Sequence, residues 1–438
     1  MNAPLVSVPV IIPGDQVLAP AETWTAASHS DRATPVLDAG PAAEPLGSQA
    51  RRLFHALKLY DRPRHPRTPL LHVPVVRQAA LLGHGLYCVA KLGGAVAERV
   101  GKSRLQQLRE IAGLAWRQGL DAQTYYMQEL YRAGGRQRAA ETLTRFETKN
   151  GLLSALKLLQ PRSDAKRSPL GDKLAFHARC RRHGIDTVPI LLSAVRGQYD
   201  VVDGDFAEGE DLFMKPRHGK GARGAALLRH LGQTHYRTDD GRILSQSALL
   251  ADLARRSLET PYLLQPRLTN HRDIADLAGE SLLVVRVITC LDDAGRPVIT
   301  HSMLRVIGKL EPGWDDATEY AAPIDLATGR MGAMTGDKLG AALDWHDRHP
   351  VTQTPVAGRI LAAWPEVRQA ALRAHRAFAD RVLLGWDIAV TPQGVVVIEG
   401  NALPDVAFLQ RVHRQPIGQS LLAPLLRGHL GRLEAASS

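Results

Sequence analysis

The spacing of apolar and polar residues divides the chain into three stretches. Residues 1–50 are rich in Ala and Pro and show no sustained period, which predicts disorder. In residues 51–165, apolar positions such as Leu108 and Ile111 recur three and four apart, which predicts a helical N-terminal module. Residues 166–438 mix helical periods with β-branched runs joined by turn residues. This order favours an α+β domain built on antiparallel sheets.

The clearest hairpin signal lies at residues 385–405, GWDIAVTPQGVVVIEGNALPD. Two apolar runs flank the turn sequence TPQG, so Asp387 and Glu399 fall within about one residue of being cross-strand partners. Two carboxylates facing each other on an apolar hairpin repel, and their burial needs a counter-charge. Asn401 points to the same face as Glu399, and three such oxygen donors suit Mg²⁺. The alternative is a solvated acidic corner that follows an edge strand.

A glycine-rich string occurs between two short apolar runs. Gly219, Gly221 and Gly224 match G-x-G-x-x-G, but a dinucleotide fingerprint would need a helix directly after the loop. A strand on each side favours a flap over nucleotide phosphates, and Lys215 just before the loop supplies positive charge. A flexible surface loop is the alternative.

Charge adds a possible partner to this picture. The net charge is +11, and most of the excess lies in residues 51–187, where Lys and Arg outnumber Asp and Glu more than twofold. The basic N-terminal module could therefore bind an anionic ligand, although an arginine-rich solvated surface would look the same.

The sequence gives no sign of export or of a membrane span. The N-terminus lacks the basic region of a signal peptide. The most apolar stretch, residues 81–100, is interrupted by His84, Lys91, Glu98 and Arg99. Three scattered cysteines support neither a disulfide framework nor a zinc site, so we expect a cytoplasmic protein without a membrane span.

The order of these motifs resembles that of the ATP-grasp superfamily, and more narrowly that of the sugar-transfer associated ATP-grasp proteins. The resemblance covers about residues 100–415, and the order of the motifs is more specific than any one of them. It rests on Asp172-Lys173, FMKPR (213–217), the glycine loop, LQP (264–266), SLLVVRVIT (281–289), PIDLATG (323–329), His349-Pro350 and GWDIAVTPQGVVVIEGN (385–401).

The resemblance implies an ATP-grasp fold, in which two α+β subdomains with antiparallel sheets sandwich ATP, here preceded by the helical module. It implies that Lys173 and Lys215 contact the phosphates of ATP and that the loop from Gly219 to Gly224 closes over them. Gln265 and Leu268 would lie at the adenine-side hinge, where many relatives carry an acidic residue. Asp387, Glu399 and Asn401 would hold one or two Mg²⁺ ions.

The implied activity is that of an ATP- and Mg²⁺-dependent carboxylate–amine ligase, which forms an amide through an acylphosphate. Its substrates would be a small carboxylate and an amine, such as an amino acid, a sugar acid or another small or sugar-linked metabolite. Arg286 lies in an apolar run and needs an anion, which is either the substrate carboxylate or, as a structural ion pair, Asp387 or Glu399. Arg305 on the next run is a second catalytic candidate.

Two other functions remain open on the sequence. An ATP-grasp kinase would phosphorylate a small molecule and form no amide. A basic adaptor would bind RNA or another anionic polymer and would hold nucleotide only as a structural element. Under the ligase hypothesis, Asp387→Asn and Glu399→Gln are each expected to abolish turnover and to leave the fold intact.

Overall fold

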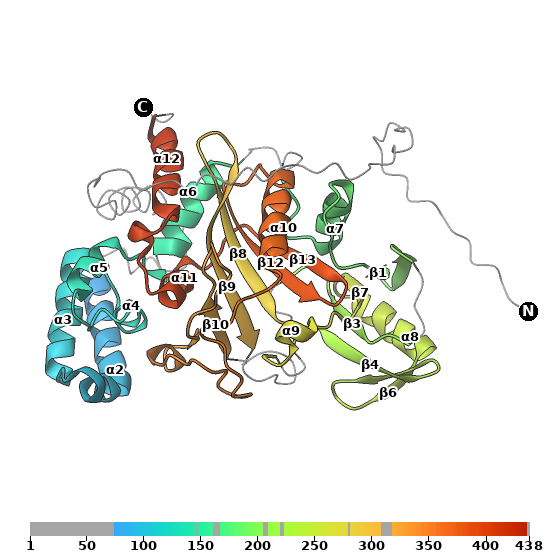
Figure 1. The fold of residues 1–438 in the computed structure, drawn as a ribbon, viewed down its shortest axis with the longest axis horizontal. Helices are drawn as coiled ribbons and strands as arrows, with labels where there is room; N and C mark the ends of the chain where they lie inside the picture. Colours follow the sequence, from blue (N-terminus) through green and yellow to red (C-terminus); the bar gives the residue numbers. More distant parts are fainter. Residues whose placement is uncertain are drawn as a thin grey trace, which may run out of the picture. The chain divides into compact units, whose positions relative to one another are not determined.

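The described part of the chain begins with helices and continues into two antiparallel sheets, as the computed structural model shows (Figure 1). Contacts divide the chain into residues 1–43 and 44–438, and every described residue belongs to the second unit. The structure describes residues 74–145, 147–160, 167–204, 209–219, 223–278, 281–307 and 318–435. The predicted disordered segment, residues 1–50, and the start of the predicted module lie outside these ranges.

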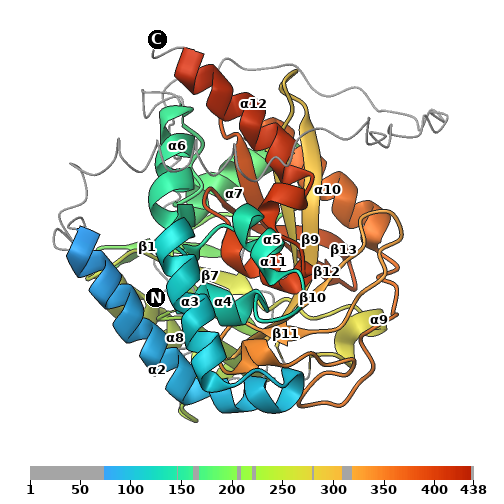
Figure 2. The same ribbon diagram turned by 90° about the vertical axis from the view of Figure 1, so that its left-hand side faces the viewer.

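The elements that precede the first strand in the described residues are all helical, as the apolar spacing predicts. They are α2 (Pro74–Val100), α3 (Arg104–Gln118), α4 (Ala122–Met127), α5 (Gly135–Glu141), the π-helical turn η3 (Glu147–Leu152), α6 (Leu153–Leu158) and α7 (Lys173–Arg182). Ser103 caps α3, and Asp121 caps α4 by accepting a hydrogen bond from the backbone N–H of Thr124 at 2.7 Å. Helices α2, α3 and α4 pack together (Figure 2).

Helix α2 shows how a long apolar helix is used in this module. Cys88, Leu92 and Val96, spaced four apart, are buried against α3 and α4. Residues 78–100 are nevertheless long and apolar enough to cross a membrane by length and composition, with one third of the most apolar window buried. A single helix of this kind is weak evidence, so the absence of a membrane span stays a prediction.

The first sheet has seven strands in the order β2-β1-β7-β3-β4-β5-β6, all antiparallel. Its strands are β1 (Leu192–Val195), β2 (Gln198–Val201), β3 (Leu212–Pro216), β4 (Ala226–Gly232), β5 (His235–Thr238), β6 (Ile243–Ser245) and β7 (Tyr262–Pro266). Helix α8 (Gln246–Ser257) covers one face and forms a core with the apolar residues of β1, β3 and β7. The short helix α9 (Arg272–Ala275) follows this sheet.

The second sheet has six strands in the order β11-β10-β9-β8-β12-β13, again all antiparallel. Its strands are β8 (Val284–Leu291), β9 (Pro297–Ile307), β10 (Glu319–Pro323), β11 (Thr335–Gly336), β12 (Leu383–Thr391) and β13 (Gly394–Asn401). Further helical segments are η5 (Ala341–Leu343), α10 (Trp364–Ala377), α11 (Val406–His413), η6 (Ile417–Gln419) and α12 (Leu422–Ala435).

The two faces of the six-stranded sheet are covered by different helices. Helix α10 packs on one face around the fully buried Trp386, whose indole N–H donates to Thr289 Oγ1 at 2.8 Å. Helices α11 and α12 belong to the core on the other face, together with Ile288 and Met303. By strand alternation, Arg286 and Asp387 point toward this second face, which leaves room there for a polar site.

Backbone contacts link the two sheets. Val397 of β13 donates its N–H to Asp186 O at 2.9 Å, and its carbonyl accepts from Thr187 Oγ1 at 2.9 Å. His271, after β7, donates its N–H to Val390 O at 2.9 Å. These bonds hold β13 beside the start of the first sheet.

Candidate active site

A register shift places the two predicted metal carboxylates opposite each other. From Thr391↔Gly394 to Ile388↔Val397 the hairpin of β12 and β13 is regular, and in that register Asp387 would face Ile398. The structure has a bulge at this point, and Asp387 pairs with Glu399 instead. The prediction that these carboxylates are cross-strand neighbours is confirmed, and the bulge is the physical reason.

Two arginines share the carboxylate of Asp387. Asp387 lies directly opposite Arg286 on β8 and forms a two-pronged ion pair with it, whose Nη2–Oδ2 distance is 2.9 Å. Arg305 Nη1 lies 3.2 Å from Oδ1, and the same guanidinium binds Glu319 at 2.5 and 2.6 Å. Burial opposes the charge of Asp387, but Arg286 and Arg305 hold its pKa below the ordinary value. The ion-pair alternative considered for Arg286 is therefore what the structure contains.

Glu399 is left in a different electrostatic environment. Burial and the neighbouring charge of Asp387 raise the pKa of its carboxyl above the ordinary value. Asn401 donates its amide N–H to Glu399 Oε1 at 3.2 Å and to Asp387 Oδ2 at 3.4 Å. The three side chains predicted as metal ligands thus converge, and Glu399 is the one that a further cation would stabilise most.

Lys215 and Lys173 bring positive charge from the seven-stranded sheet. On β3, Phe213 and Lys215 alternate with Leu212 and Met214, which are buried against α8, so Lys215 points to the opposite face. Burial and the nearby charge of Lys173 lower the pKa of Lys215 to about 8, while Glu399 acts in the other direction. Burial also lowers the pKa of Lys173. Two desolvated ammonium groups within range of Glu399 favour an anion between them.

The glycine loop is anchored at both ends. Lys173 Nζ lies 3.2 Å from Gly219 O, and Arg217 forms a bidentate pair with Asp172 at 2.7 and 2.5 Å. At the far end Tyr262 donates its hydroxyl to Gly224 O at 3.3 Å. The positive φ angles of Gly219 (118°) and Gly224 (74°) explain why glycine occupies these positions. Gly221 lies outside the described residues.

The predicted hinge residues follow the same face of the first sheet. Gln265 on β7 pairs with Phe213, so its side chain lies on the face that carries Lys215. Its amide N–H group donates to Pro189 O at 3.1 Å, whereas its buried Oε1 has no hydrogen-bond partner among the described residues. Leu268 is half-buried just after this strand. An unpaired acceptor here suits the amino group of a purine, which is a donor.

The donor set fits magnesium on chemical grounds. Among the described residues, no group of three or more His, Cys, Asp or Glu side chains could hold a metal. The two carboxylates and the amide of Asn401 are nonetheless hard oxygen donors, and Mg²⁺ takes few protein ligands when phosphates and water supply the rest. The pKa of Glu399 is raised because burial and the charge of Asp387 disfavour its ionised form, and a bound cation would offset both effects.

A pocket of about 200 Å³ opens beside Arg286 and Arg305. Its wall also contains Glu319 and Asp337, whose carboxyl pKa is raised by burial and by the charge of Glu319. Other parts of the wall come from Ile288 and Met303 of the sheet, from α4 and the residues that flank it, from Arg145, and from α11 with the two residues before it. The pocket therefore has guanidinium groups and carboxyl groups side by side.

Several residues of this pocket were not among the site residues predicted from the sequence. Asp337 follows the two-residue strand β11, which is too short to give a periodic signal. Gln128, directly after α4, donates its amide N–H to Ala407 O of α11 at 3.0 Å, so segments far apart in sequence close the pocket. Glu319, the glutamate that pairs with Arg305, is the first residue of β10 and belongs to no sequence motif.

Comparison with known proteins gives one family match. The family model for the sugar-transfer associated ATP-grasp proteins matches residues 157–422, more than half of the chain. Comparison with curated proteins gives no match.

The similar solved structures are distant. One is a D-alanine–D-alanine ligase from Bacillus anthracis complexed with ATP, at 14% identity and a TM-score of 0.34, covering 66% of this chain and 71% of that one. Another is an ADP complex of N5-carboxyaminoimidazole ribonucleotide synthetase, at 11% identity and a TM-score of 0.34, covering 55% of this chain. The chain spans 46% of the length of that synthetase.

The family match agrees with the antiparallel sheets, the glycine loop and the paired carboxylates described above. Members of this superfamily generally bind ATP with Mg²⁺ and are typically ATP-dependent ligases. The chain belongs to the sugar-transfer associated ATP-grasp family and has the ATP-grasp fold, α+β with antiparallel sheets and N-terminal helices.

Proposed function

We propose that the protein is an ATP- and Mg²⁺-dependent carboxylate–amine ligase. The observation that carries this proposal is the arrangement of charge around Asp387 and Glu399. Lys173 and Lys215 interact electrostatically with Glu399, and Arg286 and Arg305, which pair with Asp387, line a pocket. Phosphates would be bound by the lysines, and a substrate carboxylate by the arginines.

The first step would join the substrate carboxylate to the terminal phosphate of ATP. A carboxylate oxygen attacks the γ-phosphorus, the bond from that phosphorus to the β–γ bridging oxygen breaks, and ADP leaves with the electron pair. Lys215 and Lys173 would orient the phosphates, and Arg286 would stabilise the charge of the acylphosphate. Mg²⁺, held by Asp387, Glu399 and Asn401, would supply charge neutralisation at the phosphates when bound.

The second step would form the amide. The amine nitrogen attacks the acyl carbon, the carbon–oxygen bond to the phosphoryl group breaks, and inorganic phosphate leaves. The amine must lose a proton, and we assign this role to Asp337 because it lies in the same pocket and because burial and the charge of Glu319 raise its carboxyl pKa above the ordinary value. A pocket with both guanidinium and carboxyl groups suits an acid and an amine of small size.

A phosphate-release screen tests the proposal. The chain is incubated with ATP, Mg²⁺ and pools of carboxylates and amines, with Glu399→Gln as the inactive control. We expect phosphate release that requires one acid and one amine. ADP formation with a stable phosphorylated product and no free phosphate would refute the ligase proposal and would indicate a kinase.

Hydroxylamine separates the two steps. It traps an acylphosphate as a hydroxamate, and it is already uncharged near neutral pH, so it needs no base. We expect Asp337→Asn to keep hydroxamate formation with the active acid and to lose most of the reaction with the natural amine. Equal loss of both reactions would contradict the role given to Asp337.

A further inference from the structure

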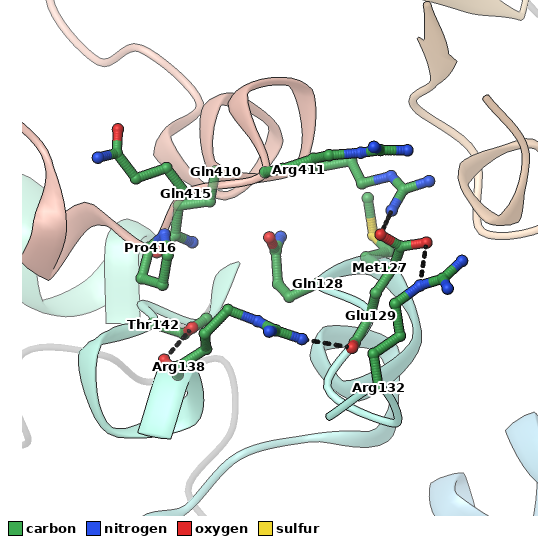
Figure 3. Close-up of a pocket in the computed structure, with 11 residues that line it drawn as sticks. Met127, Gln128, Glu129, Arg132, Arg138, Thr142, Gln410, Arg411, Gln415 and Pro416 are labelled. Atoms are coloured by element: carbon green, nitrogen blue, oxygen red, sulfur yellow. Dashed lines mark hydrogen bonds and ion pairs between the residues drawn. The ribbon is translucent and has the colours of Figure 1, made fainter. Parts of the chain in front are cut away.

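A second pocket lies away from the paired carboxylates, between α4, α5 and α11 (Figure 3). Its volume is about 330 Å³, and the residues that line it include four arginines and one glutamate. The arginines are Arg132, Arg138, Arg411 and Arg414, and the glutamate is Glu129. The charged groups of the pocket therefore carry a net positive charge.

Glu129 is shared and cannot neutralise the cluster. Figure 3 shows its carboxylate between two guanidinium groups, 3.1 Å from Arg132 Nε and 3.5 Å from Arg411 Nη1. Burial opposes its charge, but Arg411, Arg132 and Arg414 hold its pKa below the ordinary value. Glu129 is thus fully ionised at neutral pH, and the pocket still has more positive than negative charge.

Arg411 forms the buried wall of the pocket. It is 1% exposed, and its Nη2 has no hydrogen-bond partner among the described residues. Its Nε donates to Thr335 Oγ1 at 3.0 Å, and its guanidinium lies 4.2 Å from the ring centre of Trp345. Burial lowers the pKa of Arg411 to about 10, which shows that its charge is poorly compensated where it lies.

Arg138 and Arg414 bring fixed charge to the rim. Arg138 is held by the carbonyls of Ala133 and Glu129, at 3.0 and 2.9 Å, so little entropy is lost when it binds a ligand. Arg414 is exposed, and its guanidinium lies 3.7 Å from the ring centre of Trp345. Planar guanidinium groups fixed around a hollow match the oxygens of a phosphate.

We propose that this arginine pocket is a binding site for a phosphorylated small molecule, separate from the site for ATP. A phosphate or diphosphate group carries enough negative charge to balance the cluster, and the hollow holds a group of that size with room for part of its substituent. Met127 and Gln128 line both this pocket and the pocket beside Arg286. A ligand bound here therefore lies next to the pocket that we propose binds the acid and the amine.

Inorganic diphosphate is the probe for this proposal. The full chain is titrated with it by calorimetry in the presence of Mg²⁺ and a saturating non-hydrolysable ATP analogue, which fills the phosphate site of Lys173 and Lys215. The titration is repeated with the double variant Arg132→Gln/Arg414→Gln. We expect the double variant to weaken binding at least about tenfold, because two charge-assisted contacts are lost. Both arginines are exposed, so we expect the unfolding midpoint of the double variant to stay close to that of the parent.

Two matched variants identify the site. Lys215→Ala removes a charge from the ATP site, and Arg376→Gln removes one from the exposed side of α10. We expect both to bind diphosphate as the parent does. The proposal is overturned if Lys215→Ala loses the binding and the double variant keeps it, if Arg376→Gln weakens it equally, or if the parent retains RNA but not diphosphate.

Discussion

The buried pair of Arg286 and Asp387 leads to a prediction about stability that separates the two carboxylates. In Asp387→Asn the side chain keeps its shape but loses its charge, and Arg286 is left without an anion. The side chains of Arg286 and Asp387 are 12% and 8% exposed, so solvent does little to compensate. Removing one partner of a buried ion pair costs about 3–5 kcal/mol.

The lower part of that range is expected here, because Arg305 retains Glu319 when Asp387 is neutralised. Glu399→Gln is the matched variant, since it also converts a carboxylate into an amide on the neighbouring strand. The pKa of Glu399 is raised, so its charge destabilises the fold in the absence of a cation, and we expect Glu399→Gln to be neutral or slightly stabilising. The expectation that either substitution would leave the fold intact is therefore revised for Asp387.

Urea unfolding of the full chain at neutral pH, without ATP or Mg²⁺, measures this difference. We expect a loss of about 3 kcal/mol in the free energy of unfolding for Asp387→Asn and no loss for Glu399→Gln. Similar stability of the two variants, or a larger loss in Glu399→Gln, would refute the assignment of Asp387 as the counter-ion of the two arginines.

Other predictions concern pH and the loop. The pKa of Lys215 is lowered to about 8, so the side chain loses its proton above that pH. In calorimetric titrations the ATP affinity should therefore fall up to about tenfold between pH 7 and pH 9, and Lys215→Arg should remove this dependence. Because the pKa of Glu399 is higher in the folded chain than its ordinary value of 4.5, the free energy of unfolding should fall as pH rises from 4.5 through the folded-state pKa. The pH dependence measured for Glu399→Gln should lack this fall. Gly224→Ala should weaken ATP binding, because φ is 74° and a Cβ would lie 3.1 Å from the Tyr262 hydroxyl, whereas Gly171→Ala, with open space, should not.

The hairpin signal and strand alternation were enough to predict much of the site. The hairpin, and with it the placement of Asp387 within about one residue of Glu399, follows from the TPQG turn and two β-branched runs, which are local features. The bulge at Ile398 that sets the final register could not be predicted, because Val395–Ile398 is an unbroken apolar run with no residue that marks where the pairing shifts.

The roles of two residues in the family motifs, His349 and Gly329, could be recognised only from their tertiary contacts. His349 was part of the family resemblance, and its Nδ1 accepts from the backbone N–H groups of Val351 and Thr352 at 3.1 and 2.9 Å. Gly329 in the PIDLATG motif packs against Trp364 so closely that a Cβ atom added at this glycine would lie 2.7 Å from the Trp364 side chain. These motif residues support local structure, and their role in the fold could be recognised only from their contacts.

The arginine pocket was also beyond the reach of a sequence pattern. Its charged residues come from two regions of the chain, with Arg132 and Arg138 in one and Arg411 and Arg414 in the other. An excess of basic residues in the N-terminal module indicated an anionic ligand in general terms. Only the packing of α11 against α4 brings the two groups of arginines around one hollow.

The most direct test of the account is a calorimetric titration of the full chain with a non-hydrolysable ATP analogue, with and without Mg²⁺. The account predicts that Mg²⁺ tightens binding to the parent protein and has little effect on Glu399→Gln, because that variant lacks the carboxylate that a cation stabilises most. If Mg²⁺ changes the affinity of both proteins equally, or of neither, the paired carboxylates of β12 and β13 do not hold the metal of an ATP complex.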